Sequence, residues 1–135
     1  MRRGNQEEKQ TLLVVDDDPV FRDLESQILS HAGYEVLQAD GAAEALRLAN
    51  NTPAIDLLLT DFRMPETNGL ELTQQFRASH PETPVLLISG EQPPMCNVPD
   101  APDFLAKPFT LSQLVQKVRH LLATATARMP ETRAA

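Results

Sequence analysis

The sequence predicts an α/β fold: a doubly wound sheet of five parallel strands with helices on both faces. Short apolar runs, typical of strands buried on both faces, alternate along the chain with helix-length segments. Such alternation favours a parallel sheet, and right-handed crossovers leave the doubly wound arrangement. The 135 residues correspond to one domain.

The first strand is expected over 11–15, an apolar run that ends at three consecutive aspartates. Asp18 and Pro19 then predict the start of a helix, with Asp18 as the N-cap and proline in the first turn. Phe21, Leu24 and Ile28 follow at helical spacing and predict its apolar face. Gly33 can take the left-handed conformation that ends the helix.

The same pattern continues to the end of the domain. Further strands are expected at the apolar runs 34–39, 55–60, 84–89 and 104–106. Helices are expected over the alanine-rich segment 42–49, around 72–76, and from Thr110 to Leu122. Thr110 and Gln113 form a capping box, and leucines and valines at helical spacing follow it. The sequence therefore predicts one domain over 11–122, with flexible tails at 1–10 and 123–135.

Charge and composition exclude several classes of function. The net charge of −7 disfavours direct binding of nucleic acid, whose phosphates an acidic surface repels. No apolar run approaches the roughly 20 residues of a membrane span. Cys96 has no second cysteine with which to form an internal disulfide, which suits the cytoplasm.

Polar side chains follow the expected strands at their carboxyl ends, where ligands bind in doubly wound sheets. They are Asp16, Asp17 and Asp18 after the first strand, Asp61 after the third, Ser89 after the fourth and Lys107 after the fifth. Clustered carboxylates repel one another unless a cation lies between them, and oxygen ligands favour Mg²⁺. A carboxylate can also be the nucleophile in phosphoryl transfer, with an ammonium and a hydroxyl nearby. A single aspartate at a strand end can be only a helix cap, but the whole set at these strand ends favours phosphoryl transfer.

The stretches LLVVDDDP, IDLLLTDFRMPETNGLEL, VLLISG and FLAKPF resemble the receiver domain of two-component response regulators. The resemblance covers about 11–122 and implies a flavodoxin-like fold with strand order 2-1-3-4-5. It implies that Asp61 is the phosphoacceptor and that Ser89 and Lys107 bind phosphoryl oxygens. Asp17, Asp61 and the backbone carbonyl of Arg63 would ligate Mg²⁺ directly, and Asp16 would act through water.

The resemblance also implies roles around this centre. Ser89 and Phe104 would form the switch that reports phosphorylation, and the Lys107–Pro108 peptide bond would be cis. Gly69 would suit the tight turn into the third helix. Arg63 and Glu91 lie where the family tunes dephosphorylation; the alternative is that they are two solvated surface charges.

By this resemblance the chain takes a phosphoryl group from a histidine kinase or histidine phosphotransfer protein, and it catalyses only its own phosphorylation and dephosphorylation. One alternative is a pseudo-receiver that serves as an interaction module without phosphorylation. A haloacid-dehalogenase-like phosphatase would use Asp16 and Asp18, but it leaves Asp61 without a role and lacks further acids soon after Lys107. A flavodoxin-like electron carrier would need a phosphate-binding loop where three aspartates stand.

The chain departs from the family between its fourth and fifth strands. Residues 91–102 contain four prolines, and each proline inside a helix costs about 3 kcal/mol. We therefore expect the helix usual at this place to be absent or a single turn. Because the family's dimer face includes that helix, the domain is expected to be a monomer. The sequence leaves open the kinase, the output, and whether the domain stands alone or belongs to a longer protein.

Overall fold

The structure is a computed structural model that describes residues 9–52, 54–90 and 102–128. Nine elements follow one another along these residues: β1 (Thr11–Val15), α1 (Pro19–His31), β2 (Glu35–Ala39), α2 (Ala42–Asn51), β3 (Leu57–Asp61), α3 (Gly69–Ser79), β4 (Val85–Ser89), β5 (Asp103–Ala106) and α4 (Leu111–Arg128). The alternation of strands and helices agrees with the sequence pattern.

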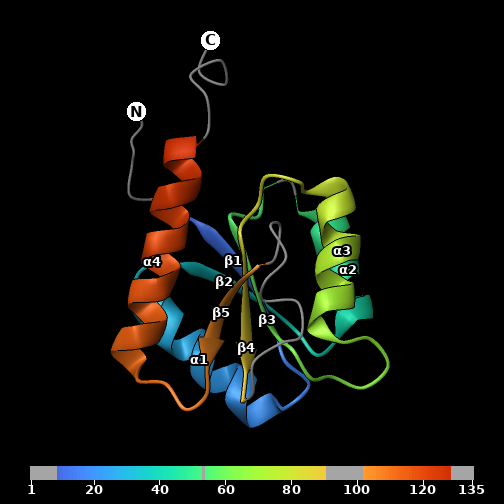
Figure 1. Ribbon diagram of the computed structural model, residues 1–135, viewed down its shortest axis with the longest axis horizontal. Coiled ribbons are helices and arrows are strands. Elements are labelled where there is room, and N and C mark those ends of the chain that lie inside the picture. Colours follow the sequence, from blue (N-terminus) through green and yellow to red (C-terminus); the bar gives the residue numbers. More distant parts are fainter. Residues whose placement is uncertain (1–8, 53, 91–101, 129–135) are drawn as a thin grey trace.

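The five strands form one parallel sheet in the order β2-β1-β3-β4-β5. Helices α1 and α4 cover one face, and α2 and α3 cover the other (Figure 1). Alternate residues of each central strand point into two separate cores: in β1, Leu12 and Val14 face α1 and α4, whereas Leu13 and Val15 face α2 and α3. The doubly wound sheet and its strand order are therefore confirmed.

Local sequence signals fix the helix ends. The Asp18 carboxylate accepts hydrogen bonds from the amides of Val20 and Phe21, so Asp18 is the N-cap of α1. The capping box predicted for the last helix is present, with Thr110 and Gln113 each donating a backbone N–H to the other's side chain. Gly33 follows the end of α1 with φ of 105°, the left-handed conformation expected there.

The buried face of α1 differs in part from the predicted one: Ile28 packs against the core and Phe21 is half-buried, whereas Leu24 is exposed. Leu24 is 49% exposed, and the buried residues are Glu25, Ser26 and Leu29. Packing against the sheet has turned the helix by about one position, because the apolar spacing alone leaves that rotation undetermined. A carboxyl group consequently faces the protein interior.

The last helix is longer than predicted. Helix α4 runs to Arg128, six residues into the segment 123–135 that we expected to be a flexible tail. Ala125 is buried against the domain, so the apolar stripe of the helix continues past Leu122. The small side chains of this segment carry no pattern strong enough to show that from sequence.

Two expectations fall partly or wholly outside the described residues. The shortened helix was expected over 91–102, of which only Pro102 is described; the N-terminal tail is described only at residues 9 and 10. In the part of the chain that is described, no helix has both the length and the apolar character needed to cross a membrane.

Candidate functional site

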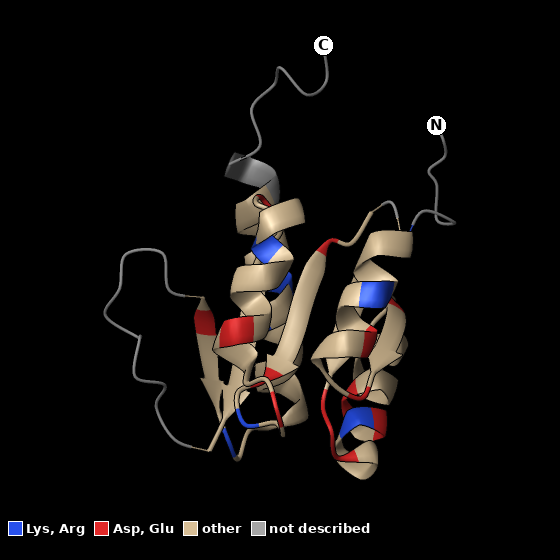
Figure 2. Ribbon diagram, turned by 90° about the vertical axis from the view of Figure 1, so that its right-hand side faces the viewer, with Lys and Arg blue, Asp and Glu red and all other residues tan. Residues whose placement is uncertain are grey.

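The carboxyl ends of the strands bring the acidic residues to one edge of the sheet. Asp16 and Asp40 directly follow β1 and β2, and Asp61 is the last residue of β3; Figure 2 shows the acidic segments of the ribbon. Because β1 pairs with β3 in parallel, Asp16 and Asp61 end neighbouring strands at the same level.

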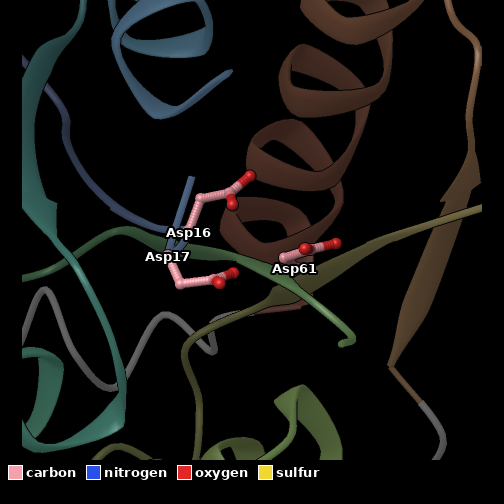
Figure 3. Close-up of side chains that lie close together, drawn as sticks. All are labelled: Asp16, Asp17 and Asp61. Atoms are coloured by element: carbon pink, nitrogen blue, oxygen red, sulfur yellow. The ribbon is translucent and has the colours of Figure 1, made fainter. Parts of the chain in front are cut away.

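Three carboxylates converge at this edge. One oxygen from each of Asp16, Asp17 and Asp61 lies within 4.8 Å of the others (Figure 3). The strand alternation continues through β1, so Asp16 follows Leu12 and Val14 toward the α1 side and Asp17 points to the opposite side. The cluster therefore spans the end of the sheet. The resemblance implied direct Mg²⁺ ligation by Asp17 and Asp61 and a water-mediated role for Asp16, and the structure brings these three carboxylates together.

Lys107 reaches the cluster from the segment after β5. Its backbone N–H donates to the carbonyl of Ser89 at 2.8 Å, which extends the pairing of β4 with β5 by one residue. The Lys107 Nζ lies 3.5 Å from Asp61 Oδ1 and 4.3 Å from the centroid of the Phe21 ring. The Lys107–Pro108 peptide bond is cis, as the resemblance implied.

Burial governs the electrostatics of the cluster. It raises the pKa of Asp16 to about 6, assisted by the charges of Asp61 and Asp17 and opposed by a hydrogen bond from the Asp18 amide and by Lys107. Burial likewise raises the pKa of Asp61, while the Lys107 ammonium lowers it. The three carboxylates repel one another at this edge, and a bound cation would relieve that repulsion.

The remaining predicted residues lie around the cluster. Ser89 is buried at the end of β4, and Phe104 is half-buried on β5, beside Leu87 of β4. Arg63 is exposed, two residues beyond Asp61. Their roles, including that of the Arg63 carbonyl, stay predictions, and Glu91 lies outside the described residues.

Gly69 holds the loop after Asp61 close to the sheet. Its N–H donates to the carbonyl of Phe62 at 2.8 Å. A Cβ at this position would lie 2.5 Å from the backbone oxygen of Asp61, 2.9 Å from a methyl carbon of Leu87 and 3.0 Å from the Phe62 Cα. Only glycine fits this approach, which agrees with the tight turn expected there.

Sequence reasoning missed three site neighbours on α1. Phe21 packs under the Lys107 ammonium, and Arg22 Nη1 donates to the backbone carbonyl of Asp16 at 2.8 Å. Glu25, one turn further on, is 2% exposed. The spacing of Phe21, Glu25 and Leu29 by four residues was the available signal, because it places Glu25 on an inward-facing row.

The arrangement fits a hard divalent cation. The cluster offers carboxylate oxygens only, and Asp16 Oδ2 is buried without a hydrogen-bond partner in the described part of the chain. Carboxylate oxygens suit Mg²⁺, and a neighbouring ammonium suits a phosphoryl group.

Comparison with known proteins identifies similar domains. A family model of the response regulator receiver domain matches residues 12–119. Response regulator MprA of Mycobacterium sp. (strain KMS) is 38% identical over 116 residues, which cover 82% of this chain and 50% of that protein. The chain thus spans about half the length of the first curated relatives that it matches.

Solved structures agree with the sequence match. The chemotaxis protein CheY4 of Vibrio cholerae superposes with a TM-score of 0.78 at 29% identity, covering 84% of this chain and 99% of that one. The receiver domain of NtrX from Brucella abortus gives a TM-score of 0.73 at 34% identity, covering 84% and 98%.

Proposed function

The chain belongs to the response regulator receiver domain family of two-component signalling, and from this premise we propose that it accepts a phosphoryl group on Asp61 with the help of Mg²⁺. The observation that carries the proposal is the convergence of Asp61 with Asp16, Asp17 and Lys107 at one edge of the sheet. In this reading the chain catalyses only its own phosphorylation and dephosphorylation.

The Asp61 carboxylate is the nucleophile in the proposed reaction. One of its oxygens forms a bond to the phosphorus of the donor, and the bond from phosphorus to the donor atom breaks, with its electron pair leaving on the donor. The Lys107 ammonium, 3.5 Å from Asp61 Oδ1, lies where it can neutralise phosphoryl oxygens. Ser89, buried at the end of the neighbouring strand, supplies a hydroxyl donor for the same oxygens.

Asp17 and Asp61 would hold Mg²⁺ directly with the Arg63 carbonyl, and Asp16 would hold a water bound to it. When bound, the ion offsets the negative charge of the carboxylates and of the incoming phosphoryl group. The chain's own residues prepare the site: the Asp18 N–H, 3.0 Å from Asp16 Oδ1, and Arg22 orient Asp16 at the end of β1.

The proposed donors are a histidine kinase or a histidine phosphotransfer protein of the cytoplasm, acting on a monomeric receiver. An exposed apolar surface beside the site supports a protein donor: Val20 and Leu24 on α1 are 77% and 49% exposed, and Leu111 begins α4. The Phe21–Phe109 contact, with ring centroids 6.0 Å apart, joins α1 to the segment that precedes α4. Val20→Asp should slow phosphorylation by a phosphohistidine protein and leave labelling by acetyl phosphate unchanged; equal slowing of both would contradict the docking role.

Acetyl phosphate tests the phosphoacceptor directly. With Mg²⁺, intact-mass measurement should show one added phosphoryl group on the wild type and none on Asp61→Asn. The matched control is Asp40→Asn, which changes an exposed aspartate at the end of β2, outside the cluster, and should be labelled like the wild type. Equal phosphoryl uptake by Asp61→Asn and the wild type would show that Asp61 is not the phosphoacceptor.

A further inference from the structure

A carboxyl group from α1 is buried next to the acidic cluster. Glu25 follows Phe21 by four residues and Arg22 by three, so it lies on the same face of the helix as both. Phe21 contacts Lys107, and Arg22 donates to the Asp16 carbonyl, so this face of α1 looks onto the end of β1. Glu25 is 2% exposed there.

Two buried carboxyl oxygens in this region have no hydrogen-bond partner in the part of the chain that is described. One is Glu25 Oε2, and the other is Asp16 Oδ2, whose companion Oδ1 accepts the Asp18 N–H at 3.0 Å. Buried polar atoms are rarely left unpaired, and water molecules commonly bridge those that the protein leaves without a partner. Asp16 is thus held from one side by backbone and needs a second partner on its other oxygen.

The surroundings of Glu25 make its carboxyl a hydrogen-bond donor at neutral pH. Burial, with smaller effects from the charges of Asp16 and Asp61, raises its pKa to about 8, and Lys107 opposes them. A protonated carboxyl carries an O–H, whereas Asp16 offers only acceptors once ionised. The two groups are therefore complementary across a bridging water.

We propose that Glu25 is a positioning residue of the receiver site, which orients the Asp16 carboxylate through a water bridging Glu25 and Asp16 Oδ2. The orientation of Asp16 does not depend on the proposed function. The consequence for metal binding does depend on it, because an Asp16 fixed at both oxygens holds the hydration shell of Mg²⁺ better than one fixed at a single oxygen. Loss of a residue that hydrogen-bonds to a metal ligand commonly lowers metal affinity roughly 10- to 100-fold.

Two substitutions of Glu25 separate positioning from packing. Glu25→Gln keeps a donor and an acceptor at the same place, whereas Glu25→Leu keeps the volume and removes both. Asp23→Leu is the matched control, because Asp23 is an exposed acid on the same helix. All three should fold, since leucine suits a buried helical position and the glutamine is isosteric.

The first measurement is hydrogen exchange of the Asp18 amide in metal-free protein, because this N–H is bound by the Asp16 carboxylate. Glu25→Leu should speed its exchange about 3- to 10-fold, the range of one weakened hydrogen bond, and Glu25→Gln and Asp23→Leu should leave it near the wild-type rate. The second measurement is the Mg²⁺ dissociation constant by calorimetry, which should rise about tenfold in Glu25→Leu and less than about threefold in the other two.

The results of these measurements decide whether Glu25 positions Asp16. Unchanged Asp18 exchange in Glu25→Leu overturns the inference, even if the variant is more stable, because packing alone would give that result. Equal exchange rates in the leucine and glutamine variants, both faster than wild type, also overturn it, because glutamine keeps a donor and an acceptor at this place and a bridging water should then have been retained. If wild type binds no Mg²⁺, the proposed function fails, and the Asp18 measurement still decides the role of Glu25.

Discussion

Replacing Glu25 by glutamine is expected to stabilise the metal-free domain by an amount that grows with pH. The pKa of Glu25 is about 8 in the folded state against an ordinary value of 4.5, chiefly because burial disfavours the carboxylate. Between these two values the folded chain keeps a proton that the unfolded chain has released. The stability associated with this proton is complete below pH 4.5 and is lost as the pH rises toward 8.

The size of the effect follows from that interval. Each pH unit between 4.5 and about 8 lowers the free energy of unfolding of the wild type by about 1.4 kcal/mol. The loss reaches about 3 kcal/mol at pH 7 and approaches 5 kcal/mol above pH 8, a large share of the roughly 5–15 kcal/mol typical of a domain. Glutamine does not titrate, so the variant escapes this loss.

Urea unfolding in EDTA, followed by circular dichroism, measures the difference. The sequence has no tryptophan, which makes fluorescence a poor probe. Subtracting the wild-type curve from the Glu25→Gln curve cancels the other titrating groups, including Asp16, to first order. The difference should grow by more than about 2 kcal/mol between pH 5 and pH 7.5. Parallel curves over that range would show that Glu25 titrates near its ordinary pKa and would refute the reasoning.

Three further outcomes follow from the site. Gly69→Ala should lower the free energy of unfolding by about 1–3 kcal/mol, because the new Cβ would lie 2.5 Å from the Asp61 backbone oxygen. Gly41→Ala is the control, since nothing lies within 4 Å of the new Cβ there, and equal losses of stability in the two variants would contradict the close approach at Gly69. Asp17→Asn should weaken Mg²⁺ binding about tenfold in calorimetry, and an unchanged affinity would place the ion elsewhere. Mg²⁺ affinity should rise from pH 5 to pH 7 with net proton release, because the cation competes with the proton of Asp16, whose pKa is about 6. Calorimetry in buffers of different ionisation enthalpy would detect the released protons, and no release at pH 5.5 would argue against the site.

The sequence predicted most of the fold because its signals are local. The apolar run 11–15 and the cap at Asp18 identify a strand and a helix start without knowledge of anything distant. The gathering of Asp17, Asp61 and Lys107 could also be predicted, since carboxyl ends of parallel strands share one edge whatever the details of packing. The position of the site could therefore be predicted as soon as the strands were assigned.

Tertiary packing decided the features that local sequence patterns do not determine, above all the rotation of α1 about its axis. The spacing of apolar residues allowed α1 to turn Leu24 inward, and contact with the sheet instead buried Glu25 beside Asp16. The same contact placed Phe21 against Lys107, two residues far apart in sequence. A helix can rotate about its axis by one position at little cost in periodicity, so the choice is made by the surface that it packs against. The sequence by itself determined which strand ends carry the acids, and only the folded structure determined which α1 side chains surround them.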